Sequence, residues 1–210
     1  MRKKIIASVA AAASLAVLAP ATVSATGSSS QQTLADVLLS DSAKDNADGF
    51  DYRWWDYDIV TQAVLLFPDL VAAASNPDAE LTVFLPNDQA FRRLVKEVTG
   101  DWVRSEADVF AAVASLGTDT VKNVLLYHIV PAEISYRDAL RADGAVLGTL
   151  LDGSTLEVDV QRSYRWKYIT LIDADTNDRD ARVVRPNIGG ESANGYAHGV
   201  DRVLRPIDLP

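Results

Sequence analysis

The stretch LTVFLPNDQAF, from Leu81 to Phe91, decides the fold at the centre of the chain. Its first half, up to Leu85, is mostly apolar and predicts a buried strand that Pro86 closes. Asn87 then offers the side chain of a helix N-cap. The helix that follows is amphipathic, because its apolar residues fall on one face. These residues are Ala90, Phe91, Leu94, Val95 and Val98. The stretch therefore predicts a strand followed directly by a helix.

Helical patterns flank this stretch on both sides. Upstream, Thr33 begins a short capped helix, and Asp58 is the predicted N-cap of a second helix that ends at Pro68. Downstream, Ser105 and Thr118 are the predicted N-caps of two more helices. The rest of the chain changes to the pattern of strands, most clearly where apolar residues alternate. These predicted strands span residues 155–160, 168–173, 181–185 and 196–204. Helices followed by strands indicate an α+β domain with a mostly antiparallel sheet.

The N-terminus has the pattern of a secretory signal peptide, which we expect to span residues 1–25. Basic residues at positions 2–4 precede an apolar, Ala-rich run, and small residues at positions 23–25 suit cleavage. The run is shorter than the roughly 20 residues that a membrane span needs, so we expect none. Residues 26–49 are predicted to be a flexible N-terminal segment, and residues 50–208 a single domain. We therefore expect a secreted protein.

Composition argues against several classes of function. The chain contains no cysteine, which excludes disulfides, thiolate metal sites and a cysteine nucleophile. It has 29 acidic and 20 basic residues. Removal of residues 1–25 takes away three basic residues and no acidic one, so the formal net charge changes from −9 to −12. Such a surface repels nucleic acids and anionic membranes, and we expect no nucleic-acid partner.

Signals of catalysis are weak. Ser192 lies in Gly190-Glu-Ser-Ala-Asn194, which resembles a hydrolase Gly-x-Ser-x-Gly motif but lacks its last glycine and its strand–turn–helix context. His128 and His198, the two histidines of the chain, have no further histidine, cysteine or glutamate at metal-ligand spacing. No pair of carboxylates stands out for general acid–base chemistry. We therefore expect no catalytic residue, no metal site and no cofactor.

The acidic segment DADTNDRD, residues 173–180, begins like a calcium-binding loop. Its sixth position holds Asp178 where glycine is required, and the twelfth holds Val184 where a bidentate glutamate is required. An acidic hairpin tip is the better interpretation.

The segment FDYRWWDY, residues 50–57, holds five aromatic side chains beside aspartates. Such rings suit a sugar or a protein partner, and they are equally suited to cover the core, since aromatic side chains bury large areas. We favour packing, and keep Trp54 and Trp55 as candidate partner-binding residues.

Three blocks follow one another along the chain: LTVFLPNDQAF (81–91), VLLYHIVP (124–131) and NGYAHGVDRVLRP (194–206). In this order they resemble the fasciclin domain, an extracellular module, over most of the chain after Phe50. The family usually has Thr-Asn or Thr-Asp where this sequence has Asn87-Asp88, and Asn caps a helix about as well as Thr. The resemblance implies an α+β fold, a β-wedge or sandwich of mostly antiparallel strands with several helices packed along it.

The resemblance also bears on the stretch LYHIVP, residues 126–131, because the family's Tyr-His motif falls on Tyr127 and His128. It implies that these two are candidate partner-binding residues. From its apolar surroundings alone, His128 is expected to be a core residue, whose burial without a hydrogen bond costs about 1–3 kcal/mol. We expect Asp88 or a nearby backbone carbonyl to accept a proton from its ring. Tyr127 is expected to be exposed, with its pose set by the histidine.

The resemblance implies adhesion or protein–protein binding, without enzyme activity or a cofactor. We expect the partner to be an extracellular protein or a cell-surface component, and self-association stays open. One alternative is an extracellular carrier of an apolar small molecule, a lipid or a pigment, held in a groove between helices and sheet. The other is a hydrolase of an extracellular polymer that uses Ser192 or His198.

Overall fold

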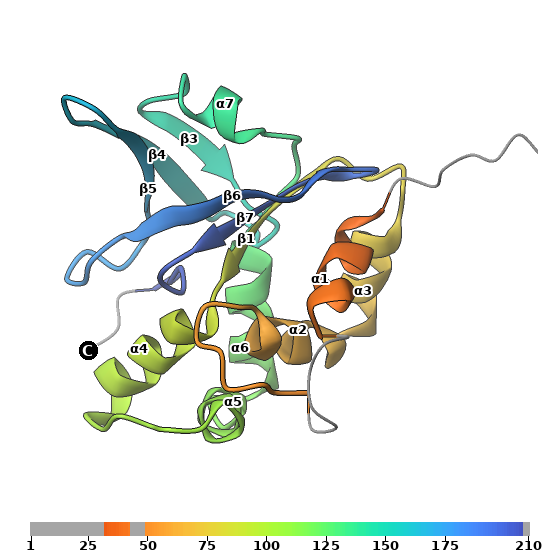
Figure 1. The fold of residues 1–210 in the computed structure, drawn as a ribbon, viewed down its shortest axis with the longest axis vertical. Coiled ribbons are helices and arrows are strands. Elements are labelled where there is room, and N and C mark those ends of the chain that lie inside the picture. The colour runs from red at the N-terminus through yellow and green to blue at the C-terminus, as the bar shows by residue number, and fades with distance from the viewer. Residues whose placement is uncertain (1–31, 43–48, 208–210) are drawn as a thin grey trace, which may run out of the picture.

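The computed structural model describes residues 32–42 and 49–207, and the predicted signal peptide lies outside them. The described residues form a seven-stranded sheet with helices gathered mainly on one side of it (Figure 1). The helices are α1 (Leu34–Ser42), α2 (Asp58–Leu65), α3 (Pro68–Ser75), α4 (Asp88–Thr99), α5 (Glu106–Ala114), α6 (Thr118–Tyr127) and α7 (Tyr136–Ala139). Among these helices, none alone is long and apolar enough to cross a membrane; α2 with α3 and α5 with α6 qualify only as pairs bent by 108° and 104°.

The sheet has the strand order β2-β1-β7-β6-β5-β4-β3. The strands are β1 (Leu81–Pro86), β2 (Ile129–Val130), β3 (Ala145–Gly148), β4 (Thr155–Arg162), β5 (Lys167–Ile172), β6 (Ala181–Ser192) and β7 (Gly195–Val200). β1 and β7 pair in parallel, and the other neighbours pair antiparallel. This arrangement is the predicted α+β wedge of mostly antiparallel strands with helices packed along it.

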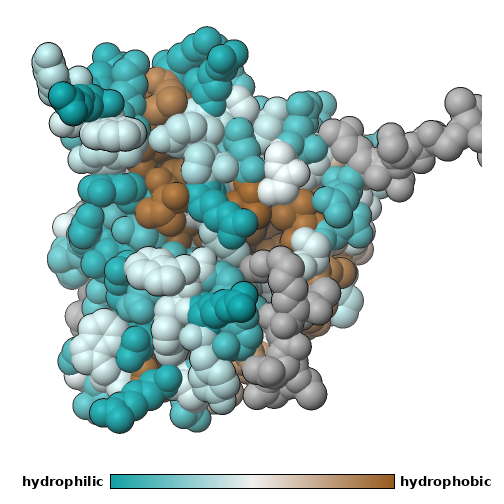
Figure 2. Space-filling model, in the orientation of Figure 1, coloured by the Kyte–Doolittle hydropathy of each residue, from teal (hydrophilic) through white to brown (hydrophobic). Residues whose placement is uncertain are grey.

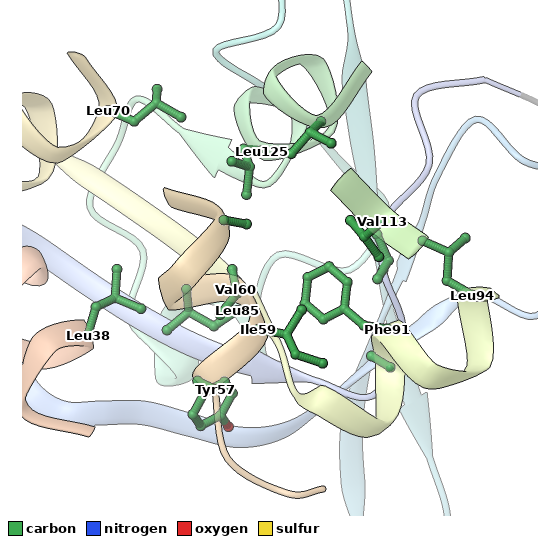
Figure 3. Close-up of a cluster of buried hydrophobic side chains, with 14 of the residues drawn as sticks. Leu38, Tyr57, Ile59, Val60, Leu70, Leu85, Phe91, Leu94, Val113 and Leu125 are labelled. Carbon is green, nitrogen blue, oxygen red and sulfur yellow. The ribbon is translucent and has the colours of Figure 1, made fainter. Parts of the chain in front are cut away.

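The parallel pair β1–β7 separates two hydrophobic cores, because side chains alternate between the two faces of a strand. On one face, Leu81 and Leu85 of β1 join a core built with α1 to α6. On the other face, Phe84 joins Val200 of β7 and the inward side chains of β4 and β5 in a second core. Figure 3 shows the first core, in which labelled side chains from all six helices and from β1 converge.

Helix α1 belongs to the folded domain, although residues 26–49 were expected to be flexible. Leu34 and Leu38 lie in the first core, with 1% and 7% of their surface exposed. The Asn194 side chain at the β6–β7 turn accepts the backbone N–H of Leu34 at 2.9 Å. The same amide donates to the carbonyls of Ala74 and Asn76 at the end of α3, at 2.8 and 3.0 Å. The burial of these two leucines and the three hydrogen bonds of Asn194, which we call the Asn194 clamp, hold α1 in place, although Gly, Ser and Gln residues precede it in the sequence.

Two of the predicted helix caps are confirmed. The Asn87 side chain accepts the N–H of Ala90 at 2.9 Å at the start of α4. The Ser105 side chain accepts the N–H of Asp108 at 3.1 Å at the start of α5. Both satisfy a backbone donor that has no partner within the helix.

The predicted caps at Asp58 and Thr118 are wrong. Each is instead the first residue of its helix, preceded by a residue that makes no side-chain cap bond. At α2 the carboxylate of Asp88, from a distant part of the chain, accepts the N–H of Ile59 at 2.9 Å. A tertiary contact thus replaces the local cap, and it brings the starts of α2 and α4 together.

Candidate interaction surface

Residues 49–57, which precede α2, carry the aromatic segment, and hydrogen bonds of their backbone hold them in place. N–H groups at the start of α4 donate to the carbonyls of Trp54 and Asp56, at 2.8 and 3.1 Å. The N–H of Tyr52 donates to the carboxylate of Glu106, the first residue of α5, at 2.8 Å. Tyr52 has φ 68°, a left-handed conformation that costs a non-glycine residue about 1–2 kcal/mol. These contacts therefore hold the loop in a conformation that it would not adopt alone.

Four rings and one guanidinium form what we call the aromatic surface: Tyr52, Trp54, Trp55, Trp102 and Arg92. Trp55, Tyr52 and Trp102 are 68%, 63% and 54% exposed. Trp54 is half-buried and packs against the first core. The guanidinium of Arg92 lies 4.4 Å from the ring centroid of Trp54 and 5.2 Å from that of Trp102. Packing thus accounts for Trp54, whereas Trp55 presents most of its ring to solvent.

Five acidic residues from this loop and from the starts of three helices lie close together. We call them the carboxylate cluster: Asp51, Asp56, Asp58, Asp88 and Glu106. They form two groups that share Asp58, one with Asp51 and Glu106 and one with Asp56 and Asp88. Within each group, one carboxylate oxygen from each residue lies within 4.8 Å of one oxygen from each of the other two. Asp58, Asp88 and Glu106 are the first residues of α2, α4 and α5, so three helix N-termini meet at the cluster.

The cluster is buried and electrostatically unusual. Asp58, Asp88 and Glu106 are 1%, 0% and 0% exposed. Oδ1 of Asp88 accepts the Ile59 N–H, and the side chains of Asp88 and Asp56 are hydrogen-bonded to each other. Burial, and then the neighbouring carboxyl of Asp56, raises the pKa of Asp88 to about 10. Burial raises the pKa of Asp56 to about 6.

His128 is a core residue whose two ring nitrogens are both used. The ring is 3% exposed. Its Nε2 accepts the backbone N–H of Leu204 at 2.9 Å, so the proton is on Nδ1, which donates to the carbonyl of Val124 at 2.7 Å. Of the two expected acceptors, the backbone carbonyl is therefore the one found, and Asp88 is not. Burial lowers the pKa of His128 to about 4, which keeps the ring neutral at pH 7.

The expectation that Tyr127 is exposed is wrong. Its side chain is fully buried in the second core, and its hydroxyl donates to the carbonyl of Thr155 at 2.9 Å. Tyr127, Asp173 and Pro206 are among the residues that line a hollow of about 720 Å³, open solvent included. Binding of a partner by Tyr127 or His128 stays a prediction.

The residues named for a hydrolase have structural roles. Ser192 ends β6 and is 5% exposed. Nδ1 of His198 accepts the N–H of Asn187 at 3.1 Å, so Nε2 carries the proton and donates to the carbonyl of Ile134 at 2.8 Å. Both nitrogens of His198 are thus used, and no lone pair remains to activate a serine.

The loop that begins like a calcium site closes around an arginine. The Arg205 guanidinium lies 2.9 Å from carboxylate oxygens of both Asp175 and Asp178. It also pairs with Glu97 of α4. Asp173 accepts the backbone N–H of Arg205 at 2.8 Å. Arg205 therefore connects this acidic loop to α4.

An apolar hollow lies between helices and sheet. It is bounded by α1, α3 and strands β1, β2 and β7, and Leu38, Val83 and Ile129 are part of its wall. Its volume is about 440 Å³, open solvent included. Figure 2 shows that apolar residues also reach the surface on this face, between the β6–β7 ribbon and α1.

The sequence did not reveal the carboxylate cluster, because its members come from three separate segments. The available signal was an acidic first residue in three helices: Asp58, Asp88 and Glu106. Acidic residues are common at that position, where they stabilise the helix dipole, so this signal does not indicate convergence.

A family profile and a solved structure are both similar to this chain. The fasciclin domain profile matches residues 58–206, which include all three sequence blocks. No curated protein matches the chain. The solved structure of a FAS1 domain pair from the insect cell adhesion molecule Fasciclin I is similar, with a TM-score of 0.55 and 18% identity over 83% of this chain. The match covers 51% of that pair, and at this identity it shows the fold alone. With most of its length matched by the profile, the chain belongs to the fasciclin domain family.

Proposed function

We propose that this fasciclin domain is a secreted, non-enzymatic module that binds an extracellular protein or a cell-surface component through the aromatic surface. The observation that carries the proposal is the exposure of Trp55 and Tyr52 on a loop that is fixed by contacts to α4 and α5. A fixed loop loses little conformational entropy on binding. Exposed tryptophan and tyrosine side chains are the residue types that most often dominate the energy of an interface.

The family supports this proposal at the level of module type. The insect protein is a cell adhesion molecule, and its fold is similar to that of this domain. The used nitrogens of His198 and the burial of Ser192 give a hydrolase no support within the described residues.

The test uses beads coated with residues 26–210, the expected mature chain. We expect the beads to adhere to cells or matrix of the producing organism, and the soluble protein to compete with this adhesion. Beads that aggregate with one another would identify a second copy of the chain as the partner. Adhesion no greater than that of albumin-coated beads would contradict the proposal.

A second candidate function is the carriage of an apolar small molecule, and the apolar hollow between α1, α3 and the sheet favours it. Only about 30 Å³ of this space admits a water-sized sphere, against roughly 300–1,000 Å³ in typical ligand pockets, so a bound molecule would have to push the helices and the sheet apart. A native mass spectrum of the protein secreted by its own host distinguishes the two functions. Extra mass that is lost on denaturation supports a carrier, whereas a bare polypeptide supports the adhesion module.

A further inference from the structure

We propose that the hollow lined by Asp173 binds a lysine side chain of a partner protein. We call it the acidic hollow, and it lies where β4 begins and β5 ends, beside β3 (Figure 1). Its wall includes Val146, Ser154, Thr155, Glu157, Ile172 and Asp173. None of these residues belongs to the aromatic surface, so the proposal does not rest on the function proposed above.

The acidic hollow has room for a ligand without any movement of the fold. Of its volume of about 720 Å³, about 370 Å³ admits a water-sized sphere. Typical ligand pockets measure roughly 300–1,000 Å³. In the apolar hollow between α1, α3 and the sheet, by contrast, only about 30 Å³ is accessible in this sense. The acidic hollow is therefore the space in which a side chain fits as the domain stands.

The wall of the acidic hollow carries negative charge. Glu157 and Asp173 belong to it, and its described residues include no Lys, Arg or His. Within the described ranges, no ion pair involves either carboxylate. Asp173 is fixed by two backbone donors, the N–H of Asp175 at 3.0 Å from Oδ1 and the N–H of Arg205 at 2.8 Å from Oδ2. Because a cleft lined by charge of one sign attracts the opposite charge, we expect a cationic ligand.

Apolar side chains flank one of the two carboxylates. Val146 of β3, Glu157 of β4 and Ile172 of β5 lie directly opposite one another in the sheet. Side chains in such positions share a face, with Cβ atoms about 4.5–5.5 Å apart. Val146 is 63% exposed and Ile172 37% exposed. A ligand that combines an apolar stem with a terminal positive charge covers these two side chains and reaches the carboxylates, which an inorganic cation does not do.

The environment of Asp173 favours lysine over arginine. Each oxygen of this carboxylate already accepts a backbone N–H, so the carboxylate is not free to receive the planar, two-pronged donor of a guanidinium. An ammonium group has three rotatable donors and needs no planar match.

The open shape of the hollow favours a side chain over a free amine. Val146, Thr155 and Glu157 in its wall are exposed. Small molecules are usually held in sites that bury 70–90% of their surface. A lysine that belongs to a larger partner does not need such enclosure, because the rest of the partner supplies further contacts.

The test follows the backbone amides of ¹⁵N-labelled residues 26–210 by NMR at low salt and pH 7.5, above the pKa of about 6 to which burial raises Asp173. The probe is the acetylated and amidated peptide Gly-Gly-Lys-Gly-Gly. We expect saturable shifts in residues 153–157 and 172–174 with a Kd on the order of 1–10 mM, because single exposed ion pairs are weak. The same peptide with Nε-acetyl-lysine should cause none of these shifts.

Three outcomes would overturn the assignment. Equal shifts with the acetylated lysine would show that charge plays no part. Tighter binding of n-pentylamine than of the lysine peptide would identify a free amine as the ligand. Binding of the arginine counterpart with equal or higher affinity would contradict the preference for an ammonium group.

Matched variants locate the binding. Glu157→Gln changes an exposed side chain, should fold normally, and should weaken the binding of the lysine peptide about two- to fivefold. Asp173→Asn, at the half-buried carboxylate, should weaken it about tenfold or more. Asp78→Asn removes an equal charge from the exposed loop before β1 and should keep the wild-type affinity. Wild-type affinity in Glu157→Gln, or an equal loss in Asp78→Asn, would contradict binding in the acidic hollow.

Discussion

Replacement of His128 by alanine should destabilise the domain by about 3 kcal/mol. The backbone N–H of Leu204, a residue that is 0% exposed, loses its acceptor, and a buried unsatisfied donor costs about 1–3 kcal/mol. The cavity left by the ring adds about 1–2 kcal/mol. The carbonyl of Val124 also accepts the backbone N–H of residue 128, so it adds little. Since 1 kcal/mol shifts the melting temperature of a domain of this size by about 2–4 °C, we expect a decrease of roughly 6–12 °C.

Glutamine at position 128 is the matched control, because its side-chain oxygen can reach the position of Nε2 and accept the Leu204 N–H. His128→Gln should recover about half of the lost stability. Thermal unfolding at pH 7.5, followed by circular dichroism, measures both variants. A melting curve of His128→Ala that equals that of the wild type would refute the reasoning, because it would mean that the ring is neither buried nor needed by Leu204.

The contribution of His128 to the stability of the domain depends on pH. The pKa of His128 falls from 6.5 in the unfolded chain to about 4 in the folded domain. As the pH decreases below 6.5, the unfolded chain therefore takes up a proton first, and the folded state loses up to roughly 3 kcal/mol by pH 4. Above pH 6.5 this effect is absent. Other groups titrate in this range, so the difference in stability between wild type and His128→Gln is measured. The advantage of the wild type, about 1.5 kcal/mol at pH 7.5, should shrink as the pH falls and reverse by pH 4.

Two further substitutions, with Gly190→Ala as a control, test the contacts made at the β6–β7 turn. Asn194→Ala removes three hydrogen bonds, among them the one to the Leu34 N–H, and should cost about 2–4 kcal/mol with faster hydrogen exchange in α1. Equal exchange in α1 would argue against the clamp. Gly195→Ala would place a Cβ 1.7 Å from the carbonyl oxygen of Leu81 and should prevent folding. Gly190 also has a positive φ, 86° against 131° at Gly195, but open space surrounds its Cβ position, so Gly190→Ala should cost only about 1–2 kcal/mol. Comparable losses in both variants would contradict the close approach of β7 to β1.

Local patterns predicted the parts of this fold that local chemistry determines. The strand at Leu81, the cap at Asn87 and the cap at Ser105 depend on neighbouring residues, and all three are confirmed. The four predicted strands are present as β4 to β7, although β6 runs on to Ser192 and β7 ends at Val200. The short elements β3 and α7 were not predicted, because four residues carry too little periodicity.

The features that failed depend on contacts between distant segments. Asp58 was expected to cap its own helix, but Asp88 accepts the Ile59 N–H instead. Tyr127 was expected to be exposed because of the motif that it belongs to, but the second core encloses it. The carboxylate cluster combines residues 51–58 with the starts of α4 and α5, and no spacing along the chain indicates that these meet.

The proposed binding through the aromatic surface is tested most directly by one pair of variants in the bead adhesion assay. Trp55→Ala removes an exposed ring from that surface, and Trp166→Ala removes a ring that is 75% exposed near the β4–β5 turn. Both are expected to fold normally, because exposed side chains contribute little to stability. We predict that Trp55→Ala weakens adhesion by about tenfold or more, whereas Trp166→Ala adheres like the wild type. Unchanged adhesion of Trp55→Ala would contradict recognition through this surface.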